Sequence, residues 1–148
     1  MNVLVGVDES PFSTTAVDFV KRMPWPSGTR VRAVSASPPF FSAAPEALPD
    51  VIAQVIEQQD RFHKDLADRA AASLRAGGLA AESAMVPGDP RSALVEEARR
   101  WEADLLVVGS HGRSGLKRLV LGSVAAHVAS HAPCSVLIVK QPHADAKD

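Results

Sequence analysis

The 148-residue chain has very little cysteine and no long apolar run. Its single cysteine, Cys134, cannot form a disulfide within the chain, which is typical of proteins from a reducing compartment. No apolar stretch approaches the roughly 18 residues of a membrane-spanning helix, and the N-terminal MNVLVGVDES lacks the basic start and long core of a signal peptide. We therefore expect a cytoplasmic protein with no membrane partner.

The chain also lacks an excess of charge of either sign. Its 16 basic and 17 acidic residues leave a formal net charge of -1, which gives no electrostatic reason to expect a nucleic-acid partner. The composition, 46% hydrophobic and 22% charged, is ordinary for a globular protein, and the length fits one core. We predict a single domain over residues 1–141 and a polar tail over residues 142–148.

Several enzyme motifs are missing. The sequence contains no Walker loop, no G-x-G-x-x-G fingerprint, no nucleophile elbow, and neither the H-x-G-H nor the S-G-G-x-D-S signature of nucleotide-dependent enzymes. Cys134 follows Pro133 and leads into an aliphatic run, a poor setting for a nucleophile. His127 and His131 stand four residues apart, but no acidic partner or fourth ligand completes a zinc site. We therefore predict no catalytic residues.

What the chain does have is an alternation of short apolar runs with longer helical segments. The strand-length runs are Val3–Val7, Val31–Ala36, Ala80–Val86, Leu105–Val108 and Val136–Val139. Helices are predicted from Ser10 to about Met23, from Val51 to Gly77, after Asp89-Pro90, and from Ser123 to about His131. The pattern predicts an α/β fold: an open, doubly wound, five-stranded parallel sheet with helices on both faces.

Four glycines interrupt the segment VVGSHGRSGLKRLVLGSVAAH. Gly109 ends the fourth predicted strand and Ser123 begins the next helix, so the loop between them lies at the carboxyl edge of the sheet, where open sheets bind ligands. Gly109, Gly112 and Gly122 would let the main chain fold closely around an anion, and Ser123 would add a hydroxyl beside the helix N-terminus. The alternative is a surface connection with flexible turns.

Asp8 follows the first predicted strand at the same edge of the sheet. Its carboxylate would accept a ribose hydroxyl or hold a divalent cation through water, or it would merely cap the helix that begins near Ser10. Phe40 and Phe41 lie in the long loop SPPFFSAAPEALPD. They would either cover a bound base or fill the gap beside the long helix, and the sequence does not choose between these roles.

The glycine segment GSHGRSGLKRLVLGS has the order G-x2-G-x9-G-S and lies between DLLVVG and VAAHVASHAPCSVLIVK. Together with the start VLVGVDESPFSTTAV, this order resembles the universal stress protein family in its ATP-binding form. The resemblance covers nearly the whole chain. It implies a Rossmann-like fold of the adenine nucleotide alpha hydrolase type and a bound ATP, with or without Mg2+. The residues implied in the site are Asp8, Val34, Gly109, Gly112, Arg113, Gly122, Ser123 and Val124.

Within that resemblance, the glycines and Ser123 would contact phosphates or ribose, and backbone near Val34 would meet the adenine. Glu9 stands where many relatives have glycine, and its charge would repel a triphosphate unless a metal or Arg113 offsets it. Arg113, Lys117 and Arg118 either screen phosphates or form a solvated cluster. We predict an ATP-binding regulatory protein with at most slow hydrolysis; the alternatives are a dimeric interaction module without nucleotide, or a genuine ATPase or phosphotransferase.

The resemblance also places the fifth predicted strand, SVLIVK, at a sheet edge. Its unpaired backbone groups and apolar side chains would need a cover. We predict a homodimer in which this strand pairs with its own copy through Val136, Leu137, Ile138 and Val139. The alternative is a monomer in which the last helix and the tail QPHADAKD shield the edge.

Overall fold

A computed structural model describes residues 1–41, 48–112 and 121–142, and in this part of the chain no helix is both long and apolar enough to cross a bilayer. The strands are β1 (Asn2–Gly6), β2 (Arg30–Ser37), β3 (Ala80–Pro87), β4 (Leu105–Gly109) and β5 (Ser135–Val139). The helices are α1 (Pro11–Arg22), α2 (Pro49–Ala76), α3 (Pro90–Arg100) and α4 (Ser123–His131). All neighbouring strands are parallel in the order β3-β2-β1-β4-β5, which confirms the predicted sheet.

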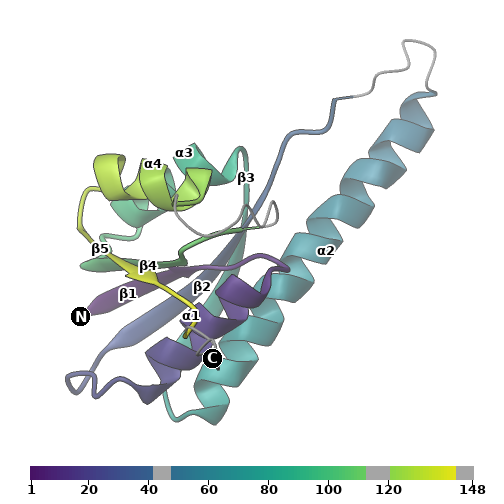
Figure 1. The fold of residues 1–148 in the computed structure, drawn as a ribbon. Coiled ribbons are helices and arrows are strands. Elements are labelled where there is room, and N and C mark those ends of the chain that lie inside the picture. Colours follow the sequence, from purple (N-terminus) through teal and green to yellow (C-terminus); the bar gives the residue numbers. More distant parts are fainter. Residues whose placement is uncertain (42–47, 113–120, 143–148) are drawn as a thin grey trace, which may run out of the picture.

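The sheet carries one hydrophobic core on each face (Figure 1). Successive side chains of a strand point to opposite faces, so Val3 and Val5 of β1 join the core beneath α1 and α2, whereas Leu4 joins the core beneath α3 and α4. All three residues are fully buried. Apolar residues on both faces of a strand therefore produced the covered parallel sheet that the sequence predicts.

Proline and a capping side chain fix the starts of α1 and α3. Ser10 accepts a hydrogen bond from Ser13 N at 3.2 Å ahead of α1, and Asp89 Oδ1 accepts one from Arg91 N at 2.9 Å ahead of α3. The long helix α2 begins two residues before the predicted Val51. Its Pro49 occupies the first turn, where the missing N–H of proline costs nothing, although a proline in a proline-rich run predicts a loop.

A buried ion pair ties α3 to the sheet. Glu97 of α3 is almost completely buried, and its Oε1 lies 2.7 Å from Nη1 of Arg32 on β2. The Arg32 guanidinium also lies over the Trp101 ring, 4.7 Å from its centroid. Because a buried carboxylate needs a partner, this contact holds α3, and with it the start of the helix, in a fixed place against β2.

Candidate functional site

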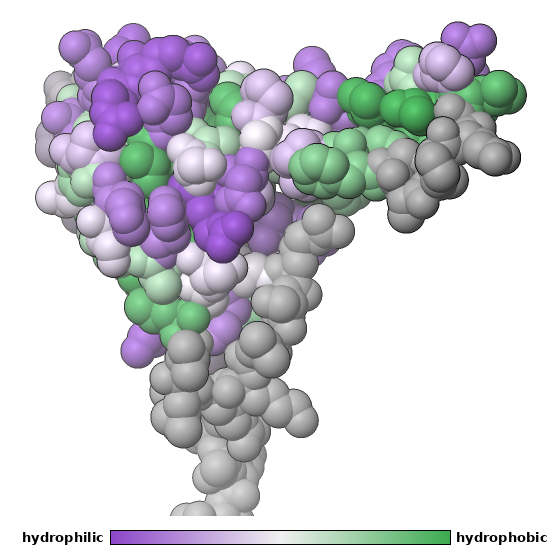
Figure 2. Space-filling model, turned by 90° about the horizontal axis from the view of Figure 1, so that it is seen from above, coloured by the Kyte–Doolittle hydropathy of each residue, from purple (hydrophilic) through white to green (hydrophobic). Residues whose placement is uncertain are grey.

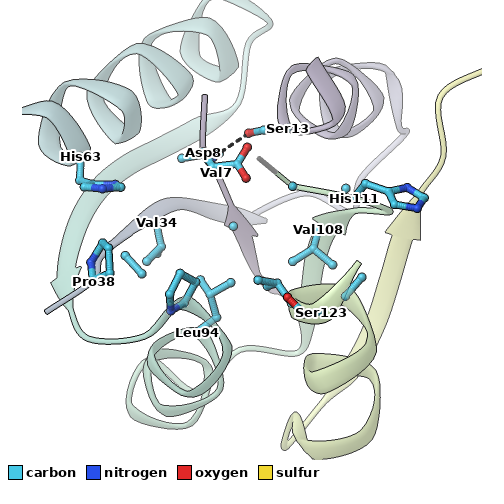
Figure 3. A pocket seen from close by; sticks show the side chains of 17 residues that line it. Val7, Asp8, Ser13, Val34, Pro38, His63, Leu94, Val108, His111 and Ser123 are labelled. Carbon is cyan, nitrogen blue, oxygen red and sulfur yellow. Dashed lines mark hydrogen bonds between the residues drawn. The ribbon is translucent and has the colours of Figure 1, made fainter. Parts of the chain in front are cut away.

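A cavity of about 230 Å3 opens at the carboxyl ends of β1 and β4 (Figure 3). The chain runs from β1 to β2 and β3 on one side of the sheet, then crosses to β4 and β5 on the other. The connections that follow β1 and β4 therefore lead to helices on opposite faces of the sheet and leave a crevice between them, which is where open parallel sheets bind ligands. The lining is mostly apolar with a few polar groups, as is typical of small-molecule sites.

The structure brings most of the predicted site residues to this cavity. Those that line it are Asp8, Val34, Gly109, Gly112, Ser123 and Val124. Gly122 stands at the edge of the site as the N-cap residue of α4. Arg113, Lys117 and Arg118 lie outside the described residues.

One oxygen of the Asp8 carboxylate belongs to a local turn, and the other lies at the cavity. Its Oδ1 accepts a hydrogen bond from Ser10 N at 2.8 Å, and its own N–H donates to Ser13 Oγ at 3.0 Å. Ser10, not Asp8, supplies the side-chain cap of α1. The other oxygen, Oδ2, faces Gly112, where an added Cβ would come within 3.0 Å of it. The carboxylate is thus held in one orientation at the mouth of the crevice.

The N-terminus of α4 supplies backbone donors to the same cavity. No side chain caps the helix, because its N-cap residue is Gly122, and the amides of its first turn have no partner within the helix. Gly122 N donates to Ser110 O at 2.8 Å, which holds the entry to the helix against the end of β4. Ser123, Val124 and Ala125 all line the cavity. The positive end of the helix dipole therefore points at the site.

Two of the motif glycines are required by the chain itself. A Cβ on Gly109 would lie 2.8 Å from the carbonyl carbon, the carbonyl oxygen and the Cβ of Phe12, and one on Gly122 would lie 3.0 Å from His111 Cα. Among the described residues, positive φ angles of glycine occur only at Gly28, Gly78 and Gly88. Gly109 and Gly122 therefore serve close approach of backbone segments, and left-handed turns do not explain them.

Other lining residues were missed from the sequence. His63 of α2 is buried, and its Nδ1 lies 2.8 Å from Ser35 Oγ. Gly6 ends β1, where a Cβ would come 2.9 Å from Leu94 Cδ1, so glycine leaves room for α3. A glycine at the end of a strand is a signal of close packing that the sequence contains. The sequence does not distinguish His63 from the other residues of a periodic helix.

Phe40 and Phe41 do not line the cavity. Both are exposed, Phe41 at 84% of its surface, and among the described residues of this loop only Pro38 reaches the site. Val34 contributes a fully buried side chain to the lining, and its carbonyl oxygen already accepts a hydrogen bond from Val7 N at 2.8 Å. The contact that Val34 offers a ligand is therefore chiefly apolar.

The described part of the lining holds little positive charge. It contains His63 and His111 but no lysine or arginine. At the start of α3, the hydrogen bond from Arg91 lowers the pKa of Asp89, with a smaller contribution from the charge of His127. Asp89 therefore stays ionised and paired, and anion binding depends on the α4 N-terminus and on groups outside the described lining.

The predicted lack of a nucleophile and of a zinc site can be compared with the geometry. Burial raises the pKa of the Cys134 thiol, which disfavours its reactive thiolate form. The rings of His127 and His131 stack with centroids 4.1 Å apart, and His131 Nδ1 lies 2.9 Å from the carbonyl oxygen of His127. Within residues 1–41, 48–112 and 121–142, no group of three or more potential ligand side chains is arranged to hold a metal ion.

These observations define the class of the protein: an open α/β domain with its cavity at the switch point of the sheet. The model of the universal stress protein family matches residues 1–140, and the chain belongs to this family. The resemblance seen in the sequence is thereby confirmed at the level of the family.

Individual relatives extend over nearly the whole chain. Universal stress protein MT1672 of Mycobacterium tuberculosis is 34% identical over 138 residues, 93% of this chain and 94% of that protein. The structure of universal stress protein UspA from Lactobacillus plantarum matches with a TM-score of 0.77 and 23% identity, covering 94% of this chain and 97% of that one. A universal stress protein solved in complex with cAMP matches with a TM-score of 0.62 and 32% identity, covering 94% and 95%.

Proposed function

We propose that the chain is an adenine-nucleotide-binding regulatory protein whose ligand is ATP. The observation that carries this proposal is the pairing, in one crevice, of the α4 N-terminus with the oriented carboxylate of Asp8. A helix N-terminus favours phosphate, and a carboxylate at a neighbouring strand end favours a ribose hydroxyl. The relative solved with cAMP, at 32% identity, supports an adenine nucleotide as the ligand class.

In this proposal each part of the nucleotide has its own group of residues. The amides at the start of α4, Gly112 and the Ser123 hydroxyl would hold phosphate. Asp8 Oδ2 would accept a ribose hydroxyl, or hold Mg2+ through water if the metal accompanies ATP. The adenine would lie in the apolar part of the cavity, which includes Val34 and Leu94.

The assignment of ATP over AMP or cAMP depends on positive charge near the phosphates. The described lining offers the positive end of a helix dipole and no lysine or arginine, which suits one or two negative charges. Arg113 follows Gly112 directly in the sequence and would supply the further charge that a triphosphate needs. Calorimetric titration of the whole chain with ATP, AMP and cAMP tests both the function and this ranking.

Regulation is the role that this site suits best. A bound nucleotide changes the populations of conformations only if it binds them with different affinity, and a loop folded around phosphate provides such a difference. We propose at most slow hydrolysis. Apart from Arg113, which this proposal places at the phosphates, the described lining offers no lysine or arginine to stabilise a transferring phosphoryl group, a contribution that is usually large.

We also propose that β5 pairs with its own copy in a homodimer. In the described part of the chain, the strand lies at the edge of the sheet and pairs with no strand other than β4. Its three central residues are apolar, alternate between the two faces of the sheet and are only half-buried; they are Val136, Leu137 and Ile138. An uncovered edge of this kind is a template for a further strand, and a two-fold axis closes the assembly.

Replacing Ile138 by proline should weaken this dimer strongly. Proline removes a backbone donor and blocks pairing along the strand, whereas Ile138→Val keeps both the donor and the apolar surface. Light scattering at micromolar concentration should give a smaller mass for Ile138→Pro than for the unmodified chain and Ile138→Val. A folded proline variant that keeps the original mass would show that the dimer interface does not involve β5.

A further inference from the structure

The first half of α2 projects beyond the sheet as an arm (Figure 1). Apolar side chains gather along the projecting part of the molecule (Figure 2). Leu48, Val51 and Phe62 keep 69%, 50% and 43% of their surface exposed. Side chains this apolar are seldom left uncovered together in a row, so the arm needs a partner.

These residues belong to one continuous line along the helix. Five apolar residues of this line recur at alternating steps of four and three residues, with Gln59 at the remaining step and Val51 beside the line. The five are Leu48, Ile52, Val55, Phe62 and Leu66. We call the six apolar residues the apolar stripe. From Leu48 to Leu66 it extends about 27 Å at 1.5 Å per residue. Such spacing is the pattern by which helices pair side by side.

The body of the protein contacts this flank of the helix at Gln59, whose side-chain amide donates to Ser37 Oγ and to the carbonyl oxygen of Pro38. The residues that α2 buries against the sheet are His63, Ala67, Ala71 and Leu74. The stripe lies on the neighbouring flank, with Ile52, Val55 and Leu66 only half-buried. The core therefore accounts for one face of α2, and among the described residues neither hydrophobic core includes a residue of the stripe.

At its lower end the stripe runs into a cleft between α1 and α2. This cleft has a volume of about 320 Å3, and Val17, Leu66 and Ala70 form its apolar wall. Asp18 and Arg69 contribute polar groups to the same cleft. The lining of the cleft also includes Asp8, Glu9 and Ser73, so only part of its wall is apolar. The stripe thus has a protruding leucine, Leu48, at one end and the apolar wall of a mixed cleft at the other.

The charges of α2 differ between its two halves. Residues 49–60 contain three carboxylates, Asp50, Glu57 and Asp60, and no lysine or arginine. Residues 61–76 contain the four basic residues Arg61, Lys64, Arg69 and Arg75 against two acidic ones. An arm without basic residues does not fit an anionic membrane surface, which attracts amphipathic helices through lysine and arginine.

We propose that the apolar stripe binds the same stripe of a second copy of this chain, with the two α2 helices antiparallel. A two-fold axis near residue 57 brings Leu48 of each copy beside Leu66 of the other, at the apolar wall of the cleft. The same arrangement sets the acidic half of each helix beside the basic half of its partner and opposes the two helix dipoles. A parallel pair would do neither.

This interface is distinct from the pairing of β5. Helix α2 contacts β2 and β3, which lie at the opposite edge of the sheet from β5. A dimer formed through β5 alone would therefore keep the two arms apart. Proximity of two α2 helices is a measurement that separates the two interfaces.

Cysteine cross-linking of the whole chain measures that proximity. In a Cys134→Ala background, Val55→Cys places a thiol near the middle of the stripe, and Lys64→Cys places one on the exposed opposite face of the same helix. A short bismaleimide should join Val55→Cys chains at least tenfold more efficiently than Lys64→Cys chains. Adding Val51→Glu should abolish the difference while circular dichroism shows an intact fold, because Val51 is half-exposed.

Equal cross-linking at both positions, absence of cross-linking at both, or full cross-linking in the presence of Val51→Glu would each overturn the proposal. Gln54→Glu serves as the matched control, since it adds the same charge at an exposed position of the arm outside the stripe. It should leave the cross-linking of Val55→Cys unchanged. Loss of cross-linking on addition of anionic vesicles, with the chain bound to them, would assign the stripe to lipid and also overturn it.

Discussion

Replacing Ser123 by aspartate should reduce ATP affinity at least a hundredfold without loss of stability. Ser123 is the first residue of α4 and lines the cavity, so the new carboxylate would stand where the phosphates are proposed to bind. Like charge would repel the phosphate, and the carboxylate would compete for the same amides. A hundredfold loss corresponds to about 2.7 kcal/mol.

The stability of this variant distinguishes a site effect from a folding effect. An acidic residue in the first turn of a helix stabilises it by about 0.3 to 1 kcal/mol, so the free energy of unfolding should stay level or rise. Ser123→Asn is the matched control, because it has nearly the shape of aspartate and no charge. It should lose less than tenfold in affinity. Equal affinities of the two variants, measured by calorimetry, would show that phosphate does not bind at the α4 N-terminus.

Replacing Gly109 by alanine should lower the free energy of unfolding by about 3 kcal/mol, which is at the upper end of the range for overpacking. The added methyl group would meet the backbone carbonyl of Phe12 at 2.8 Å, and backbone cannot move aside as a flexible side chain does. Because Phe12 lies in α1, the strain would separate this helix from the end of β4. Denaturation by urea measures the loss.

Gly112→Ala is the companion variant. Among the described residues, its methyl group would meet only the end of the Asp8 side chain, at 3.0 Å, so its cost in stability should be below 1 kcal/mol. It should instead weaken nucleotide binding by displacing the Asp8 carboxylate. Equal destabilisation by the two alanines would contradict the division of the motif into a packing glycine and a site glycine.

The fold was predictable because each of its signals is local. Prolines and capping side chains near Ser10 and Asp89 mark helix starts, and apolar runs of strand length alternate with helices. The start of α2 was placed late because Pro49 closes a run rich in proline, where a first helical turn and a loop look alike.

The site was predictable in its location and less so in its detail. Topology alone brings Asp8 and Ser123 to one edge of the sheet, since both follow or begin elements at the carboxyl ends of strands. The contact of Gly109 with Phe12 joins residues almost a hundred positions apart in the sequence, and no motif carries that information. His63 reaches the cavity only because α2 crosses that end of the sheet.

Isothermal titration of the unmodified chain with ATP, AMP and cAMP tests the central claim most directly. The proposed site predicts saturable binding of one adenine nucleotide per chain, with ATP the tightest of the three and GTP weaker than ATP. Tighter binding of AMP or cAMP would keep the site and reassign its ligand. Absence of saturable heat with all three nucleotides, in a chain that unfolds cooperatively, would contradict the account and leave the fold as an interaction module without nucleotide.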